Sequence, residues 1–467
     1  MKKLWRVTLG LGLALALVLA GCAPAPPEVA PEEEAPAVTG PSVTVEDKGT
    51  HWEVVMDYTT GKTPYEMGKE LGEAIIQAFP DYPATLDGWY ACALRGAEGY
   101  MLVCSQRFDS VEVDQKYLDE LEGLADGLGL VDETSVGDGQ LSRDELFVLN
   151  YYADVLHMWE CTAIGVWGER SKTGDVLTSR TLGLPTSGCK AFLGELNSVL
   201  TVKDGKKSFC SVGLLGFMGL LTAFKPNGLY MAVLDCGLTQ PKHNPEDEPH
   251  PVIVPADYSR TTSSICFSAR YALENFSTID EIGDYLTAKD YHWNHLWFVA
   301  DTEQAKVIEN NISGPEGWTG KPLVRDVETE LNPGVEPWVL DDSGIPDTHS
   351  IGVVNSFVAK GNYDNHTTHP RNVNRWHSQI EQLKQNLEEK GGKLDLSDLE
   401  SIQTYYQGDK PGSIYIGDLY NYDWRVYTAQ VYLFCPNTLE LWVFFENNQV
   451  EDGLPLPPVF EKVSPRF

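Results

Sequence analysis

The sequence changes character at Cys161, and this change limits the folds open to the chain. Before Cys161, apolar residues recur at helical spacing over 65–79 and 117–128, and Ser142 with Glu145 forms a capping box that opens a third helix. After it, short segments rich in β-branched and aromatic residues alternate with turn signals. A helical front followed by many strands and a few helices predicts an α+β fold built in layers.

The expected strands share this composition. After Cys161 they cover residues 162–167, 176–182, 228–235, 296–301, 306–310, 351–357, 430–435 and 440–446. Another strand is expected over 52–58, and helical spacing predicts helices over 279–287 and 375–389. Residues 328–347 are rich in Pro, Gly and acidic groups, which predicts a long surface loop.

The first residues have the features of an export signal. Residues 1–6 (MKKLWR) are basic, and the apolar run from Val7 to Ala20 is shorter than the roughly 20 residues that cross a bilayer. The run ends in Leu-Ala-Gly-Cys, which resembles the bacterial lipobox. This resemblance implies a signal peptide over 1–21, removed before Cys22, and a lipid on Cys22 that holds the protein at the membrane. A plain signal peptide with an incidental cysteine is the alternative.

Residues 22–47 are rich in Pro, Ala and Glu and contain few large apolar groups. Such a segment buries too little surface to offset the entropy of the chain, so it is expected to be a disordered tether. The net charge of −33 repels nucleic acids and anionic lipid surfaces, which excludes a nucleic-acid partner.

Motifs for metals and cofactors give weak or no signals. The nine cysteines include no CxxC pair, and the ten histidines form no HExxH motif. Residues 364–369 (DNHTTH) place two histidines in an expected loop, which is a weak metal signal. The sequence has no GxSxG or P-loop motif. We therefore expect neither a metal nor a cofactor.

The residues best suited to catalysis lie at the start of the first strand after the helical front. A turn near 172–174 returns the chain, so that Arg180 is expected close to Cys161. The thiolate is the reactive form of a cysteine whose ordinary pKa is about 8.5, and a nearby guanidinium favours it. If the chain is cut before Cys161, the new α-amine, with a pKa of about 8, can act as the general base.

These residues resemble a known family. Cys161-Thr162-Ala163, Gly174 and the Arg180–Gly183 stretch (RTLG) are similar to the nucleophile hairpin of the isopenicillin-N acyltransferase-like autoproteolytic enzymes. That family belongs to the N-terminal-nucleophile (Ntn) hydrolases and is distantly related to choloylglycine hydrolases and penicillin V acylases. Further similar stretches run in family order over nearly the whole mature chain: YEMGKELGE, YLDELEGLADGLG, SRDELFVLNYYADV, NHLWFVADTEQAKVIE, IGVVNSF and YLFCPNTLELWVFF.

The resemblance implies a four-layer αββα Ntn-hydrolase sandwich. It implies a mainly helical pro-segment over 48–160, self-cleavage at Glu160–Cys161, and a catalytic domain over 161–467. The cleaved pro-segment would remain as a subunit. Cys161 would be the nucleophile, Arg180 would orient the site, and Asn355 lies where the family has an oxyanion-stabilising residue. The alternatives for these three residues are a buried structural thiol, a surface or ion-paired arginine, and an ordinary strand-end turn former.

Five further residues are expected to contact substrate because they match or neighbour family site positions: Thr162, Thr181, Lys225, Asn227 and Arg375. The chain also departs from the family pattern. Gly183 replaces an aspartate that contacts the new amine, and Asp175 or Asp301 could supply that carboxylate instead. Thr181 and Lys225 each replace an asparagine, and Glu160 stands where Gly or Asp is commoner.

Two functions follow from this pattern. The first is an extracytoplasmic, lipid-anchored cysteine hydrolase or acyltransferase that acts on amide C–N bonds of small acylated amides or peptides. The alternative is a tethered ligand-binding lipoprotein or a catalytically inactive relative with the same fold, with which the departures at Gly183 and Lys225 agree.

Overall fold

The computed structural model describes residues 41–93, 97–132, 134–155, 160–184, 190–236, 258–312, 322–362, 366–367, 370–405, 427–446, 450–451, 454–455 and 458–467. The signal segment, Cys22 and the tether up to residue 40 lie outside these ranges, so export and lipid attachment stay predictions. Within the described ranges, no helix combines the length and the apolar composition that crossing a bilayer requires.

The larger sheet of the described residues has nine strands, and all neighbours run antiparallel except one parallel pair, β2 with β6. In spatial order the strands are β1 (Val43–Asp47), β2 (Trp52–Asp57), β6 (Asn197–Lys203), β7 (Phe209–Leu214), β8 (Thr222–Phe224), β9 (Tyr230–Asp235), β11 (His295–Ala300), β12 (Ala305–Asn310) and β13 (Leu323–Arg325).

The smaller of the two main sheets has six antiparallel strands within the described ranges. In spatial order they are β14 (Ser350–Val354), β4 (Glu160–Val166), β5 (Leu177–Leu184), β15 (Tyr427–Cys435), β16 (Glu440–Phe445) and β19 (Glu461–Val463). Two short strand pairs stand apart from both sheets: β3 (Val111–Glu112) with β10 (Thr262–Ser263), and β17 (Val450–Glu451) with β18 (Leu454–Pro455).

The helices fall into two groups on either side of β4 in the sequence. Those before β4 are α1 (Pro64–Ala78), α2 (Tyr82–Ala93), α3 (Ala97–Ser105), α4 (Gln115–Leu128), α5 (Arg143–Asn150) and α6 (Tyr152–Val155). Those after it are α7 (Lys190–Glu195), α8 (Ile265–Asn275), α9 (Ile279–Thr287), α10 (Pro370–Glu389) and α11 (Leu396–Gln403). The capping box predicted at Ser142 is present, because Ser142 Oγ accepts from Glu145 N at 3.2 Å and Glu145 Oε2 accepts from Ser142 N at 2.7 Å.

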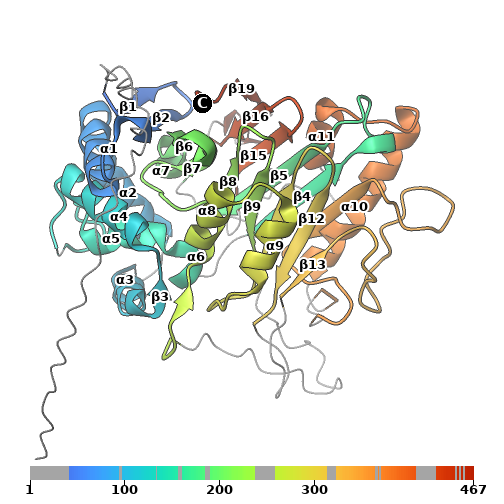
Figure 1. The fold of residues 1–467 in the computed structure, drawn as a ribbon, viewed down its shortest axis with the longest axis horizontal. Coiled ribbons are helices and arrows are strands. Elements are labelled where there is room, and N and C mark those ends of the chain that lie inside the picture. The colour runs from blue at the N-terminus through green and yellow to red at the C-terminus, as the bar shows by residue number, and fades with distance from the viewer. Residues whose placement is uncertain are drawn as a thin grey trace, which may run out of the picture. The chain divides into compact units, whose positions relative to one another are not determined.

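The two main sheets lie face to face with helices on both outer sides (Figure 1). Between the sheets, the rings of Phe434 and Phe224 have centroids 4.3 Å apart, and a Cβ on Gly165 would lie 2.9 Å from Ala305. Helices α8 and α9 contact the larger sheet, and α10 and α11 contact the smaller one. Each sheet thus buries both faces, and the predicted α+β sandwich of four layers, αββα, is confirmed.

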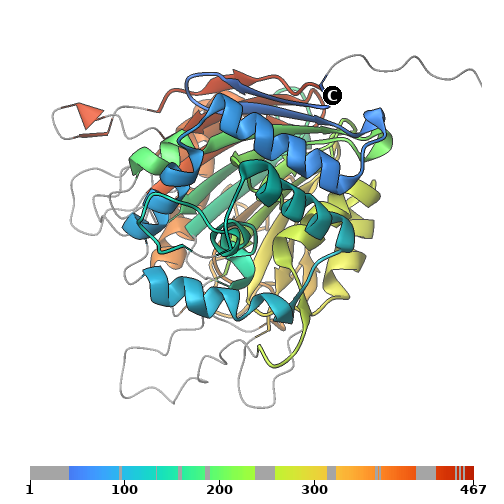
Figure 2. The same ribbon diagram turned by 90° about the vertical axis from the view of Figure 1, so that its left-hand side faces the viewer.

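The predicted pro-segment, residues 48–160, is built into this fold. Its helices gather on one side of the sheets (blue to cyan in Figure 2), and β2 pairs along its whole length with β6. The prediction of a disordered tether over 22–47 is wrong at its end, because residues 43–47 form β1. The stretch VTVED alternates apolar and polar residues, and Val43 is buried opposite Met56.

Two helices of the pro-segment pack with their backbones almost in contact. A Cβ on Gly68 of α1 would overlap the backbone oxygen of Glu120, and one on Gly123 of α4 would overlap that of Tyr65. Only glycine permits this approach, which explains the small residues in both helical motifs.

A buried carboxyl lies in the last described turn before β4. Asp154 on α6 is 2% exposed, and it accepts hydrogen bonds from Ile265 N (2.8 Å) and Ser264 Oγ (2.7 Å) at the start of α8. Burial raises the pKa of Asp154 to about 7, although both hydrogen bonds act to lower it. The end of the pro-segment is therefore fastened to α8 by a carboxyl that stays protonated in mild acid.

This carboxyl should make stability depend on pH. Between about pH 4 and pH 7 the folded chain keeps the Asp154 proton and the unfolded chain loses it, so stability falls as the pH rises. Above this window both states are ionised and the slope ends. Asp154→Asn should remove a slope of up to about 1.4 kcal/mol per pH unit in the free energy of unfolding. Urea unfolding of both proteins across the window measures it, and parallel pH curves would contradict the prediction.

Candidate active site

The hairpin of β4 and β5 places Arg180 beside Cys161. Gly174 turns the chain with a φ of +85°, a left-handed conformation that favours glycine. Cys161 lies opposite Leu182 and Arg180 opposite Ala163, so all four side chains share one face of the sheet. Arg180 Nη2 lies 3.7 Å from Cys161 Sγ. This face is the one that packs against the larger sheet.

Asn355 holds the backbone nitrogen of Cys161. It directly follows β14, which runs beside β4. Asn355 Oδ1 accepts from Cys161 N at 2.6 Å, and its Nδ2 donates to Asp235 O at 2.5 Å. Asn355 therefore accepts from the nitrogen that cleavage before Cys161 would turn into an amine, and its own donor is engaged by β9.

Arg375 on α10 completes the frame around the Cys161 backbone. Its Nη1 donates to Cys161 O at 3.1 Å, and its Nη2 donates to Asn355 Oδ1 at 3.0 Å. Asn372, one turn earlier, contacts Arg375 and also donates to Asn355 O at 2.8 Å. Arg375 is 2% exposed, so in the intact chain it positions Cys161 and does not offer a surface for substrate.

Arg180 is a fully buried cation with no carboxylate partner among the described residues. Its Nη2 donates to Val233 O at 2.6 Å, while Nε and Nη1 have no hydrogen-bond acceptor. The guanidinium carbon lies 5.5 Å from the ring centroid of Tyr432. Burying an uncompensated cation costs several kcal/mol, so the position makes sense only where negative charge is to be stabilised.

The thiol itself is closed off in the uncleaved chain. Burial raises the pKa of Cys161, which is 1% exposed, while the Arg180 guanidinium and the Gly183 N–H act to lower it. The thiol is therefore protonated near neutral pH in this state. Removing the residues that cover the thiol would weaken the effect of burial, which raises the pKa. The effect of Arg180, which lowers the pKa, would remain.

Thr162 and Thr181 lie on the opposite face of the sheet from the thiol, which corrects their predicted contact with substrate. They pair with each other across β4 and β5. Both Oγ1 atoms donate to Gln403 Oε1 on α11, at 3.2 and 3.1 Å. Side chains alternate along a strand, so the neighbours of Cys161 point toward the helical layer.

Lys225 and Asn227 are also far from Cys161, and the prediction that they line the site is wrong. Lys225 Nζ and Asn227 Nδ2 donate to backbone carbonyls in the last turn of α8 and directly after it. Their turn precedes Tyr230, whereas Asp235 at the other end of β9 meets Asn355. The five residue steps of β9 separate the two ends by about 17 Å.

One carboxylate whose charge acts on the thiol is missed by the sequence analysis. Asp175 lies in the β4–β5 turn and Asp301 in the β11–β12 turn, both at strand ends remote from Cys161. The charge of Asp235 raises the pKa of Cys161, which places it close by. Its position as the last residue of an expected strand was the available signal.

Some predicted features remain outside the described residues or outside the site. The Glu160 side chain and Cys22 are not described. Of the residues in the weak metal signal, His366 is buried with Nδ1 2.7 Å from Ser356 Oγ, and 364, 365, 368 and 369 lie outside the described ranges. Within those ranges, no three His, Cys, Asp or Glu side chains are grouped to hold a metal ion.

No protein-family model and no curated protein sequence matches the chain. Among solved structures, it is similar to the Caenorhabditis elegans ortholog of N-acylethanolamine-hydrolyzing acid amidase, at 14% identity over 59% of this chain and 93% of that one, with a TM-score of 0.37.

Two further structures show the same likeness. A variant of conjugated bile acid hydrolase from Clostridium perfringens is 11% identical over 65% of this chain and 96% of that one, with a TM-score of 0.31. Penicillin V acylase from Agrobacterium tumefaciens is 11% identical over 61% of this chain and 83% of that one, also with a TM-score of 0.31. These TM-scores are below 0.5, so the likenesses carry no argument about function. The function proposed below is supported by the geometry of the chain itself.

Proposed function

We propose that this chain is the precursor of an amide C–N hydrolase or acyltransferase with Cys161 as its nucleophile. One observation carries the proposal. Three side chains fix three atoms of Cys161: Asn355 its nitrogen, Arg375 its carbonyl oxygen and Arg180 its sulfur. A structural thiol needs no such frame, and it needs no uncompensated buried cation beside it.

Maturation would cut the bond between Glu160 and Cys161. Cys161 Sγ attacks the carbonyl carbon of Glu160, the C–N bond breaks, and the Cys161 nitrogen takes up the thiol proton and becomes an amine. Water then hydrolyses the resulting thioester, which leaves a carboxylate on Glu160 and returns the thiol. Asn355 Oδ1, which already accepts from Cys161 N, would hold the new amine in place.

In turnover, the new amine would serve as the base for its own thiol. The thiolate, stabilised by Arg180, attacks the carbonyl carbon of a substrate amide. The amine returns the proton to the leaving nitrogen, and an acyl-thioester forms on Cys161. Water then releases the acid, or a second amine takes the acyl group. This scheme needs neither a metal nor an organic cofactor.

The pro-segment would remain bound after the cut. The parallel pairing of β2 with β6 and the buried contact between Glu120 of α4 and Arg270 of α8 both join the two sides of the junction. With Cys22 lipidated, the pro-segment would tether the enzyme to the outside of the bacterial membrane. Small acylated amides or peptides are the proposed substrates.

The N-termini of the purified mature protein test this proposal. We expect two fragments on a denaturing gel, one of which begins at Cys161 by N-terminal sequencing and intact mass. The gel is run with reductant, because Cys92 of the pro-segment is disulfide-bonded. A single intact polypeptide that is inactive on N-acyl-4-nitroanilides would favour the tethered binding protein instead.

Arg180 should set the reactivity of the thiol. Arg180→Met should lower kcat for amide hydrolysis by about a hundredfold, since it removes charge stabilisation from a dry site. It should also move the pH dependence of kcat/KM to higher pH, because the thiol pKa rises without the guanidinium. Arg180→Lys keeps the charge, so its kcat and its pH dependence should lie between those of the wild type and those of Arg180→Met. A pH–rate profile identical to that of wild type would contradict this role.

A further inference from the structure

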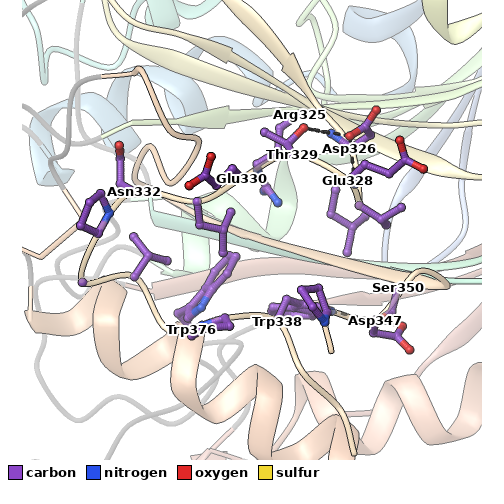
Figure 3. A pocket seen from close by; sticks show the side chains of 18 residues that line it. Arg325, Asp326, Glu328, Thr329, Glu330, Asn332, Trp338, Asp347, Ser350 and Trp376 are labelled. Carbon is purple, nitrogen blue, oxygen red and sulfur yellow. Dashed lines mark hydrogen bonds between the residues drawn. The ribbon is translucent and has the colours of Figure 1, made fainter. Parts of the chain in front are cut away.

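A cavity lies at the edge of the sandwich, away from Cys161. Its volume is about 450 Å³, within the range of pockets for small molecules, and it lies between β13, β14 and α10 (Figure 3). The predicted surface loop over 328–347 lines much of it. Ile351 of β14 lines the cavity and precedes Asn355 by four residues, so about 13 Å of strand separates the two sites.

Two tryptophans form one rigid wall of the cavity. Trp338 and Trp376 pack edge to face with ring centroids 4.9 Å apart. Their ring nitrogens are fixed, since Trp338 Nε1 donates to Ser350 Oγ at 2.9 Å and Trp376 Nε1 donates to Glu336 O at 3.0 Å. Both polar edges are therefore satisfied. Trp338, which is 7% exposed, offers a ligand its aromatic surface, and Trp376, which is 1% exposed, holds that ring in place.

Negatively charged groups outnumber positively charged ones in the lining of the cavity. Its one guanidinium, Arg325, is paired with buried Glu309 at 3.0 Å and is not available to an anion. Among the lining carboxylates, Asp347 pairs with Arg170 at 2.7 Å, and Glu330 pairs with Lys360 on the surface.

The other two lining carboxylates, half-buried Asp326 and exposed Glu328, form no salt bridge among the described residues, although the charge of Asp326 acts on the neighbouring Arg325. Thr329 Oγ1 donates to Asp326 Oδ1 at 2.8 Å, which fixes that carboxylate. In Figure 3 these two residues lie across the cavity from the tryptophan wall. The cavity thus presents an aromatic surface on one side and uncompensated negative charge on the other.

We infer that this cavity binds a small organic cation with an apolar body, such as an arylalkyl ammonium ion. The ammonium group would meet Asp326 and Glu328, and the apolar body would lie against Trp338, which Trp376 supports. An anion is disfavoured, because the cavity has no free positive group. The inference does not depend on the proposed hydrolase, since none of these residues contacts Cys161.

Calorimetric titration of the full-length Cys161→Ala chain tests this site whether or not the chain is cleaved. The probes are 4-phenylbutylamine, its neutral counterpart 4-phenylbutan-1-ol, and the anion 4-phenylbutyrate. We expect the amine to bind at least about tenfold more tightly than the alcohol, which corresponds to about 1.4 kcal/mol. Added salt should weaken the binding of the amine and leave the binding of the alcohol unchanged.

Charge-neutral variants identify the residues involved. Asp326→Asn with Glu328→Gln should reduce the affinity for the amine to that for the alcohol. Glu381→Gln, on an exposed carboxylate of α10 that does not line the cavity, should leave it unchanged. The inference is overturned if the amine shows no binding, if the butyrate binds as tightly as the amine, or if the double variant keeps the wild-type affinity for the amine.

Discussion

Cys161→Ala should leave the chain as one polypeptide and lower amide hydrolysis by about four orders of magnitude or more. In the proposed mechanism the sulfur is required twice, first to break the bond before it and then to accept the acyl group, so no partial activity should survive. The substitution removes one atom from a site whose backbone is held by Asn355 and Arg375, and the fold should persist. A denaturing gel and a 4-nitroanilide assay give the two measurements.

Cys210→Ala is the matched control for this variant. Cys210 lies on β7, is equally buried and is also a free thiol, so its loss leaves a cavity of the same size without touching the hairpin. We expect this control to cleave and to hydrolyse as the wild type does. Cleavage in Cys161→Ala would show that the cut does not use this sulfur, and it would contradict the maturation step.

Arg270→Met should lower the free energy of unfolding by about 3–5 kcal/mol. Arg270 on α8 is 1% exposed, and its guanidinium binds Glu120 of α4 in a two-pronged ion pair and Glu274 through Nε at 2.9 Å. Without it, Glu120 is left as a fully buried charge with no cation, which is the costly way to break such a pair. Urea unfolding of the uncleaved Cys161→Ala chain measures the change.

Arg466→Met provides a surface control for the same junction. Arg466 also joins the two sides of the predicted cleavage point. It pairs with Glu46 at 3.0 Å, where both side chains are more than two-fifths exposed, and with Glu53, which keeps Lys48 as a second partner. Its removal should cost less than about 1 kcal/mol. Equal losses from Arg270→Met and Arg466→Met would mean that the buried pair does not hold the pro-segment in place. Adding Glu120→Leu to Arg270→Met should recover part of the loss.

The features that follow from neighbouring residues could be predicted from the sequence. The capping box at Ser142 and the hairpin that returns Arg180 to Cys161 both depend on residues close in the chain. The strands β6 and β7 could not be found in this way, because they are buried on both faces and show no alternation of apolar and polar residues.

The site was harder to predict where it depends on faces and distant segments. Thr162 follows Cys161 in sequence but points to the opposite layer, as the two-residue period of a strand requires. Asp235 and Gln403 reach the hairpin from other strands and helices, and no local pattern shows that they meet it, although Asp235 ends a predicted strand. Lys225 was assigned by its place in a motif, while its turn lies at the wrong end of β9.

The parallel pairing of β2 with β6 fixes an order of events in the life of the chain. Residues 161–467 synthesised without the preceding part would expose the row of N–H and C=O groups along β6 as an open sheet edge, ready to join another chain. If the proposed cut before Cys161 takes place, the polypeptide must therefore assemble before it. Once cut and unfolded, its two pieces would have to find each other in solution, so loss of structure should be irreversible in the mature form.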